Sequence, residues 1–567
     1  MKKNLLFLVA IFSLFSASAQ ESMPIKPFSS IADITQYETH LAEAVIPAPD
    51  LTGFEAEDAA REKNGELYRM GVTVPVNINL QNSGTWSLLA NGDRVWRLKM
   101  SSPGAMGTLL FFNNFYLPPG ARMHVYSSDR NQMLGAFTSY NNHESGIFAT
   151  ALVKGEDCII EYYEPVEVYG LGIISMVEFG YVYRAVHEVP TITENDNMMR
   201  AADICEVDVK CPEGTPVADQ IRGVCRIQVK VGSTLGWCSG SAINNTAGDC
   251  TPYILTAQHC GVGASTADFN AWKFYFNYQR SGCGSGGATS NVLTGGALVA
   301  NSNDVSGSAI TKSDFILLES NNVFPSSYNV YLNGWNRLNV GATSGVGIHH
   351  PAGDYKKIST FCTAATSSGW STANTHWRVI WCATVTNWGV TEGGSSGSPL
   401  FNSSNLIVGQ LSGGQSYCDG GVNDPSGSTV NQDDPDVYGK FYHSWDLCGS
   451  TTNRQLKPWL DPLNTGLTTL SGRENICTIG EAEYDIENLF NMYPNPVGDV
   501  LVIESTGFNE SVHTLFIYDQ LGKLIISEPI NTGLTKKSVL VTNLKTGVYN
   551  VVISNNERSF SRKFVKL

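Results

Sequence analysis

Charged side chains are scarce in this 567-residue sequence: they make up 16% of it, against roughly 25% in an ordinary soluble protein. Asp and Glu outnumber Lys and Arg, which gives a formal net charge of −15. A chain without a basic excess lacks the face that nucleic acid binding needs, so we expect no nucleic acid partner. Gly, Ser, Asn and Thr supply the polarity instead, which favours a β-rich extracellular protein with many turns.

Long hydrophobic runs are missing after the first 19 residues. The one apolar run, 5–15, follows Lys2 and Lys3 and precedes Ala17-Ser18-Ala19, a small-x-small cleavage pattern. A transmembrane anchor would need about 20 apolar residues, and this run is shorter. We therefore predict a signal peptide over 1–19 and a secreted, soluble, monomeric mature protein.

A Cys-x-x-Cys pair is also missing, although the chain has 13 cysteines. Zinc is therefore not expected, and an exported chain should hold most of its cysteines in disulfides. Eleven cysteines lie between positions 205 and 448, and the odd total leaves at least one unpaired or bonded to another chain. We predict neither a metal nor a cofactor.

Composition and turn signals divide the rest of the chain into four parts. Residues 20–200 form a mainly β region that we interpret as a pro-region, with an independent carbohydrate-binding module as the alternative. Residues 201–477 are rich in Cys, Trp and short β-branched runs between turns, which favours an antiparallel barrel or sandwich. A linker over 478–491 leads to a tail, 492–567, whose short apolar runs predict a small β-sandwich.

A serine flanked by glycines marks the candidate nucleophile, in the stretch Gly393-Gly394-Ser395-Ser396-Gly397-Ser398-Pro399-Leu400. The glycines allow turn conformations that other residues avoid, and the N–H groups of such a turn can converge on an oxyanion. A plain Gly/Ser loop is the alternative. A serine hydroxyl also needs a base, and the base needs an acid that orients it, so the partners decide.

The region 201–477 supplies both partners. His259 ends an apolar, strand-like run, and Asp314 directly precedes another. Taken alone, each has a structural interpretation, as a buried histidine or an aspartate that caps a turn. Their joint occurrence in one domain, in the order His259, Asp314, Ser396, predicts a catalytic triad.

Further short motifs accompany these three residues. In chain order they are Cys205-Glu206-Val207-Asp208-Val209-Lys210-Cys211, Cys238-Ser239-Gly240-Ser241, Leu255-Thr256-Ala257-Gln258-His259-Cys260, Phe276-Asn277-Tyr278-Gln279, Ser313-Asp314-Phe315, His349-His350-Pro351, Gly389-Val390-Thr391-Glu392, Gly413-Gly414 and Trp459-Leu460-Asp461-Pro462. Over about 201–472 this pattern resembles the chymotrypsin-type serine endopeptidases, and more narrowly the bacterial lysyl endopeptidases (Lys-C type). The resemblance implies a chymotrypsin-like double β-barrel that hydrolyses peptide bonds after Lys, with Arg left open.

The resemblance also assigns roles to residues. His259 is the general base, Asp314 orients it, Ser396 attacks the substrate, and the N–H groups of Gly394 and Ser396 form the oxyanion hole. The family's disulfides imply the pairs Cys205–Cys418, Cys211–Cys283 and Cys238–Cys260. Proximity in sequence alone suggests a fourth pair, Cys362–Cys382.

The pocket for the substrate side chain differs from the trypsin-like pattern, because Val390 stands where that pattern has its acid. The lysyl endopeptidases place the acid downstream, where Asp436 matches, with Gly413 and Gly414 as the pocket wall. A carboxylate there would pair with the substrate ammonium, a compact point charge. A solvated acidic loop, or a calcium site formed with the two aspartates just before it, is the alternative.

Two further family features concern aromatic neighbours of the site. The family has a tryptophan that stacks on the catalytic histidine; Trp370 is the best match, Trp377 and Trp381 are alternatives, and a plain core tryptophan is the other interpretation. A family histidine just before the pocket glycines is replaced here by Ser412. This departure removes an aromatic neighbour and leaves the triad intact.

The tail has its own resemblance. Tyr493-Pro494-Asn495-Pro496, Gly547-Val548-Tyr549 and the final Lys563 and Lys566 resemble the C-terminal sorting domain of the type IX secretion system. This implies passage across an outer membrane by that machinery and removal of the tail. A cell-wall-binding β-module is the alternative.

Together these observations predict a secreted serine endopeptidase that is made as a zymogen and acts on proteins or peptides. Release between Arg200 and Ala201 would give a family-like N-terminus. A strictly Lys-cleaving enzyme would not cut there, so either another protease activates the chain or the enzyme accepts Arg. The competing prediction is a catalytically idle protease fold that serves as a surface adhesin or binding protein.

Overall fold

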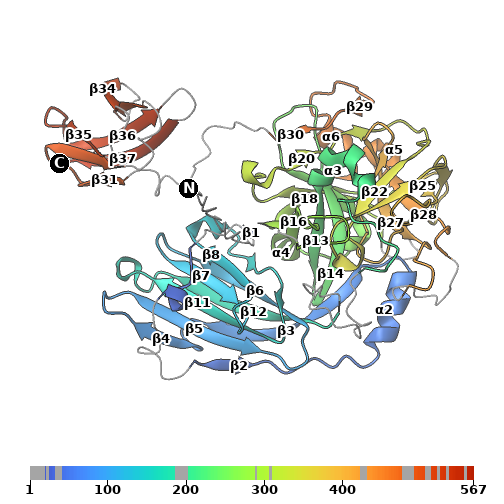
Figure 1. The fold of residues 1–567 in the computed structure, drawn as a ribbon, viewed down its shortest axis with the longest axis horizontal. Helices are drawn as coiled ribbons and strands as arrows, with labels where there is room; N and C mark the ends of the chain where they lie inside the picture. The colour runs from blue at the N-terminus through green and yellow to red at the C-terminus, as the bar shows by residue number, and fades with distance from the viewer. Residues whose placement is uncertain are drawn as a thin grey trace, which may run out of the picture. The chain divides into compact units, whose positions relative to one another are not determined.

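A computed structural model describes residues 19–20, 25–31, 41–184, 202–287, 290–305, 310–421, 431–475, 491–504, 513–519, 524–530, 536–554 and 559–567. The chain divides into two compact units, with the boundary between Ile476 and Cys477. Both units are mainly β, as predicted (Figure 1). The predicted signal peptide up to residue 18, the predicted release site and the linker up to residue 490 lie outside the described residues. In the described part, no helix is long and apolar enough to cross a membrane.

The N-terminal region of the first unit contributes one sheet of its own and part of a second. Its own six strands are β2 (Glu43–Val45), β4 (Thr85–Leu88), β5 (Arg94–Ser101), β7 (Arg122–Tyr126), β8 (Met133–Phe137) and β11 (Asp157–Glu164). Its other strands are β3 (Tyr68–Asn79), β6 (Gly107–Tyr116), β9 (Phe148–Ala149), β10 (Val153–Lys154) and β12 (Ile173–Val182). Two helices, α1 (Phe28–Ile31) and α2 (Phe54–Lys63), precede β3.

A 13-stranded sheet joins this region to the predicted protease region. The protease region and the chain start add β1 (Ala19–Gln20), β13 (Val224–Val231), β14 (Thr234–Ala242), β15 (Tyr253–Ala257), β16 (Lys273–Phe276), β17 (Asn291–Thr294), β18 (Gly296–Asn301) and β19 (Phe315–Ser320). The junction is the antiparallel pair β3 and β14, with Val72 opposite Thr234 and Tyr68 opposite Trp237. Figure 1 shows β3 running from the N-terminal sheets toward β14.

A nine-stranded sheet forms the rest of the protease region. Its strands are β21 (Trp335–Asn336), β22 (Gly345–His349), β23 (Lys357–Phe361), β24 (Thr366–Ser368), β25 (His376–Val379), β26 (Pro399–Asn402), β27 (Ile407–Gly414), β28 (Asp436–Lys440) and β29 (Thr469–Leu470). The remaining elements are the pair β20 (Tyr331–Leu332) and β30 (Arg473–Glu474), and the helices α3 (Ala218–Gly223), α4 (Thr266–Ala271), α5 (Phe441–Asp446) and α6 (Lys457–Leu460).

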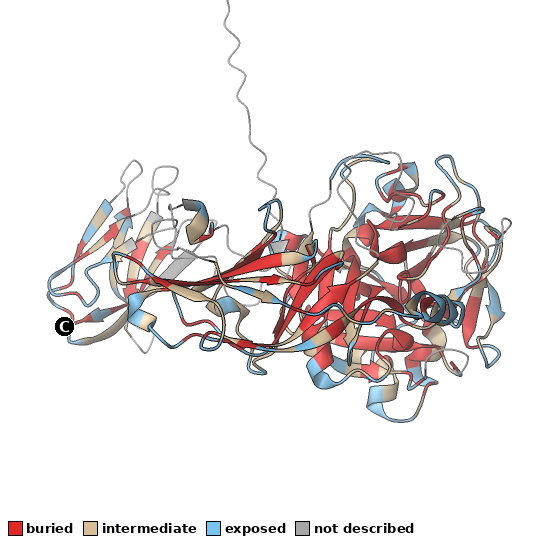
Figure 2. Ribbon diagram, turned by 90° about the horizontal axis from the view of Figure 1, so that it is seen from below, coloured by how far each residue is buried: buried red, intermediate tan, exposed pale blue. Residues whose placement is uncertain are grey.

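Buried apolar side chains hold the two protease sheets together. Leu255 and Phe315 of the first sheet share one core with Ile348 and Phe401 of the second. Figure 2 shows the buried residues concentrated along the strands. The candidate residues lie next to these strands: His259 follows β15 and Asp314 precedes β19 in the first sheet, and Ser396 precedes β26 in the second.

All four expected disulfides are present. The pair Cys238–Cys260 ties β14 to the turn that carries His259. Three other cysteines of the described part are free and buried, namely Cys158, Cys225 and Cys448.

The second unit consists of two small sheets. One has the order β31-β32-β35 and the other β34-β33-β36-β37. The strands are β31 (Asn491–Tyr493), β32 (Val500–Glu504), β33 (His513–Tyr518), β34 (Leu524–Ile530), β35 (Lys536–Leu540), β36 (Gly547–Ser554) and β37 (Ser559–Lys566). Leu501 of the first sheet and Ile517 and Val551 of the second share one core, as the apolar runs predict for a small sandwich.

Candidate active site

His259 and Asp314 lie side by side because their strands are antiparallel neighbours. Ala257 at the end of β15 faces Phe315 at the start of β19. Asp314 Oδ2 lies 2.7 Å from His259 Nδ1, and Asp314 Oδ1 accepts the His259 backbone N–H at 2.9 Å. Both side chains are fully buried. A carboxylate that accepts from Nδ1–H leaves Nε2 as the acceptor, which is the tautomer of a general base.

The backbone of Asp314 is held in an unusual conformation. Its φ is +54°, in the left-handed region that Asp tolerates better than most residues. The Asp314 N–H donates to Asp304 Oδ2 at 3.0 Å, and the Asp314 carbonyl accepts from the Gln258 N–H at 3.0 Å. These two bonds fix the turn and direct the carboxylate toward His259.

Ser396 lies on a loop that packs against the end of β15. Cys260 Sγ is 3.9 Å from the Ser396 carbonyl oxygen, and a Cβ built on Gly397 would stand 2.0 Å from Thr256 Oγ1. His259 Nε2 is buried and has no hydrogen-bond partner among the described residues. No hydrogen bond joins it to the Ser396 hydroxyl in this state, and such bonds often tighten only when substrate binds.

The peptide group between Gly393 and Gly394 has a fixed orientation. The Gly393 carbonyl accepts from the Ala352 N–H at 2.6 Å. A trans peptide holds its C=O and N–H antiparallel, so the Gly394 N–H points the opposite way. Gly394 has a φ of +94°, and a Cβ there would lie 3.0 Å from the Ala352 nitrogen. Glycine therefore meets both the conformation and the close approach at this position.

The peptide group between Ser395 and Ser396 is fixed in the same manner. Its carbonyl accepts from the Ser398 N–H at 3.0 Å, so the Ser396 N–H points away from that bond. Within the described part of the chain, neither the Gly394 N–H nor the Ser396 N–H donates a hydrogen bond. Two oriented donors without an acceptor are what an oxyanion site requires.

Asp436 begins β28 and is fully buried. Its Oδ2 accepts from Trp381 Nε1 at 2.6 Å, Thr391 Oγ1 at 2.7 Å and Ser416 Oγ at 2.6 Å. Among the described residues, its Oδ1 accepts only the Ser416 N–H, at 3.2 Å. Burial raises the pKa of Asp436 to about 6, although the hydrogen bonds from Ser416, Thr391 and Trp381 favour the charged form.

Gly414 packs directly against this carboxylate. A Cβ at Gly414 would lie 1.8 Å from Asp436 Oδ1, so any side chain there would displace the carboxylate or cover it. The two aspartates just before Asp436 differ from it, since Asp433 is exposed and Asp434 half-buried. Among the described residues, no three acidic, histidine or cysteine side chains are arranged to hold a metal ion.

The tryptophans do not take the place that the family pattern suggests. Trp370 lies across Gly413, with its ring 3.1 Å from a Cβ built on that glycine. Trp377 is buried and Trp381 binds Asp436. Among the described residues, no tryptophan ring contacts His259, so the expected stacking is not formed.

Ser412 contacts the aromatic ring of His376. Its Oγ lies 3.0 Å from Nε2 of His376, which comes from β25. Burial lowers the pKa of His376 to about 4, while the Asp314 charge acts in the opposite direction. His376 was missed in the sequence because it lies 36 positions from Ser412, and only the pairing of β25, β28 and β27 brings them together.

Side chains of the N-terminal region cover the candidate site. One groove is lined by Ser396, Gly413 and Gly414 on one side, and by Glu62, Gly65 and Glu66 on the other. A Cβ at Gly65 would stand 2.7 Å from the Trp370 ring, and one at Gly393 would stand 2.3 Å from the Tyr68 ring. The segment between α2 and β3 therefore occupies the approach to Ser396.

Comparison with known proteins agrees with this geometry. Residues 199–439 match the family model for the lysyl endopeptidase C-terminal domain. These residues are therefore similar to a lysyl endopeptidase domain. The lysyl endopeptidase of Pseudomonas aeruginosa is 31% identical over 232 residues, a match that covers 38% of this chain and 47% of that protein. The matched part thus spans about half the length of that relative.

Two solved structures and a second family model complete the comparison. The thermostable serine protease AL20 from an extremophilic microorganism aligns with a TM-score of 0.28 and 14% identity, over 39% of this chain and 92% of that one. Protease Anisep from Arthrobacter nicotinovorans aligns with a TM-score of 0.27 and 20% identity, over 39% and 91%. Residues 491–567 match the secretion system C-terminal sorting domain, so both resemblances predicted from the sequence are confirmed.

Proposed function

We propose that this protein is a secreted serine endopeptidase that cleaves peptide bonds after Lys and is made as a zymogen. The observation that carries the proposal is the buried His259–Asp314 pair beside a serine loop with two oriented, unused N–H groups. The match of residues 199–439 to the lysyl endopeptidase domain supports the same activity.

The reaction follows from the groups around Ser396. His259 Nε2 takes the hydroxyl proton as Ser396 Oγ attacks the substrate carbonyl, and Asp314 stabilises the imidazolium that forms. The tetrahedral oxyanion accepts hydrogen bonds from the N–H groups of Gly394 and Ser396, and each donor stabilises the transition state by roughly 3–4 kcal/mol. His259 then passes its proton to the leaving amine, and the C–N bond breaks to give an acyl-enzyme. A water attacks the ester through the same base, which returns Ser396 to its starting state.

The preference for Lys is assigned to Asp436. Its Oδ2 is saturated by three donors, whereas Oδ1 has one long bond and faces Gly414. An ammonium entering past Gly413 and Gly414 would reach Oδ1 and stabilise the charged form of the carboxyl. The buried carboxylate then has a partner for a charge that is otherwise costly to keep.

The second unit is assigned the role of an export signal. Its match to a sorting domain supports export to the cell surface or the medium by the type IX secretion machinery. The N-terminal region is assigned the pro-region role, because its segment 62–66 lines the groove that contains Ser396. The protein substrate enters only after this segment leaves.

The test is active-site labelling of the processed protein with a serine-directed fluorophosphonate, followed by cleavage mapping on a mixed peptide library. We expect one label on Ser396 and cuts after Lys. No label on the processed protein, or equal label on Ser396→Ala, would overturn the protease assignment. Cuts after neither Lys nor Arg would overturn the role of Asp436 alone.

A further inference from the structure

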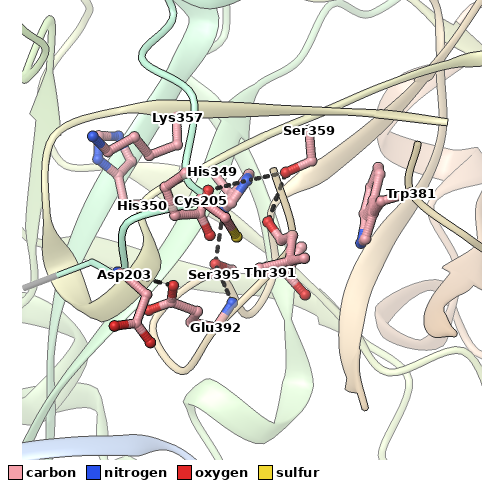
Figure 3. Close-up of polar contacts among 12 residues, drawn as sticks. Asp203, Cys205, His349, His350, Lys357, Ser359, Trp381, Thr391, Glu392 and Ser395 are labelled. Carbon is pink, nitrogen blue, oxygen red and sulfur yellow. Dashed lines mark hydrogen bonds and ion pairs between the residues drawn. The ribbon is translucent and has the colours of Figure 1, made fainter. Parts of the chain in front are cut away.

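His349 lies beneath the loop that carries Ser396 and touches none of the reacting groups. It ends β22 and is fully buried. Its Nδ1 is 2.8 Å from Ser395 Oγ, and its Nε2 is 2.9 Å from Ser359 Oγ. Figure 3 shows the ring between these two hydroxyls, with Glu392 beside Ser395.

The protons of this chain of contacts can be assigned one by one. Ser359 Oγ lies 2.6 Å from the Val390 carbonyl oxygen, which can only accept, so the single Ser359 proton is used there. Ser359 must therefore accept from His349, and Nε2 carries a proton. In a neutral ring Nδ1 is then bare, and it accepts the Ser395 O–H. The Glu392 N–H donates to Ser395 Oγ at 3.3 Å and completes the chain.

The neutral state of the ring follows from its surroundings. Burial and the nearby Lys357 charge lower the pKa of His349 to about 3. Glu206 Oε2 is 3.8 Å from Nε2, too far for a hydrogen bond. Burial and the neighbouring Glu392 raise the pKa of Glu206 well above its usual range. The imidazole therefore has one tautomer and one orientation.

These hydrogen bonds connect three points of segment 390–395, which directly precedes the nucleophile. The chain of contacts begins at the Glu392 N–H, passes through Ser395 and His349, and ends at the Val390 carbonyl. We propose that His349 is a positioning residue, which sets the oxyanion donors through the Ser395 hydroxyl. This inference rests on the proposed protease function and goes beyond it, since His349 contacts neither substrate nor Ser396.

The mechanical link to the site is the peptide between Ser395 and Ser396. With its side chain bound to His349, Ser395 keeps its carbonyl on the Ser398 N–H, and the Ser396 N–H stays directed away from that bond. Without His349, the Ser395 side chain has no fixed acceptor, and the peptide can rotate. The donors then reorganise during the reaction, which removes the advantage of a preorganised site.

The variants separate positioning from folding. His349→Leu removes both ring contacts. His349→Asn keeps an acceptor near the place of Nδ1, because its Oδ1 can take the Ser395 O–H. Ser395→Ala removes the other partner. His443→Asn is the matched control, since His443 is a partly buried histidine of α5 that contacts Cys448 and no part of the loop.

The measurements are kcat and KM of the processed protein on a lysyl amide, at a temperature where every variant is folded. We expect His349→Leu and Ser395→Ala each to lower kcat about 10- to 100-fold with KM within about twofold, from the loss of one oriented donor. The double variant should be no slower than either single one, because both remove the same contact. His349→Asn should recover most of the rate, and His443→Asn should match the parent.

Several results would overturn the proposal. One is a His349→Leu enzyme that keeps the parental kcat, and another is a His349→Leu enzyme in which only KM changes. A third is a double variant whose decrease in kcat equals the product of the decreases in the two single variants. If the parent neither labels nor cleaves, the proposed function fails, and the reaction role of His349 fails with it. The hydrogen-bond assignment is then tested separately by ¹⁵N NMR of the Ser396→Ala protein. A proton on Nδ1 of His349, instead of Nε2, would contradict it.

Discussion

The loop around Ser396 and the segment that covers it are held by different forces. Neutral, directional hydrogen bonds orient the loop: the N–H groups of Ala352 and Ser398 donate to its carbonyls, and the His349 ring accepts from the Ser395 hydroxyl. The covering segment is held mainly by charged groups. Neutral buried bonds respond little to salt or pH, whereas ion pairs respond to both. One part of the site is therefore built to stay fixed and the other to come away.

The charged anchor of the covering segment centres on two arginines. Arg69 Nε lies 2.7 Å from Asp58 Oδ1, and Arg184 Nη1 lies 2.7 Å from Glu62 Oε1. The Tyr183 hydroxyl also donates to Asp58 Oδ2 at 2.7 Å. One nitrogen on each arginine is buried and has no hydrogen-bond partner in the described part of the chain. Arg184 is also the last described residue before the predicted release site.

The largest effect should come from the fixed part. Ser396→Ala should lower hydrolysis by the processed protein about 10⁴- to 10⁶-fold, because the nucleophile itself is removed. Ser404→Ala, an exposed serine between β26 and β27, is the control and should keep full activity. A Ser396→Ala protein that still hydrolyses at a hundredth of the parental rate would place the nucleophile elsewhere.

The pocket floor should give the next largest effect. Asp436→Asn should lower kcat/KM for a lysyl substrate about 10²- to 10³-fold, because the substrate ammonium loses a buried charged partner. Its rate of fluorophosphonate labelling should change far less, since the label carries no ammonium. Equal losses in both assays would mean that Asp436 supports the fold of the site rather than Lys selection.

The same carboxylate predicts a pH effect. The pKa of Asp436 is about 6, above its usual value, so lowering the pH through 6 protonates it and removes the charge that pairs with Lys. The ratio of kcat/KM for a lysyl substrate to the labelling rate should therefore fall about tenfold for each pH unit below 6. The ratio cancels any titration common to both reactions. A flat ratio down to pH 5 would contradict the assignment.

The smallest effect concerns the covering segment. Glu62→Gln in the unprocessed chain should raise the labelling rate about tenfold, because Arg184 keeps Asp58 but loses its closer charged partner, Glu62. Lys63→Gln, an exposed change on the same helix, is the control. Burial raises the pKa of Glu62, so acidification should speed labelling of the unprocessed parent and not of Glu62→Gln. Unprocessed and processed parents that label equally fast would show that the segment does not block the site.

The sequence motifs predicted which residues would meet where those residues flank strand-forming runs or match a position in the family pattern. His259 and Asp314 flank apolar runs that become adjacent strands, and Asp436 sits where the family pattern has its acid. The surroundings of Asp436 were not predictable, because Trp381, Thr391 and Ser416 reach it from three separate segments. The His349 motif was noticed, but its role depends on the directions of protons and carbonyls that no spacing reveals.

The junction between β3 and β14 has a consequence for the mature protein. Residues Thr234–Trp237 pair with β13 on one side and with β3 on the other. If the N-terminal region is released, as proposed, this stretch becomes a sheet edge whose backbone N–H and C=O groups are exposed to water. Such an edge can accept an extended chain, so a freshly released enzyme should tend to self-associate there until the edge is covered.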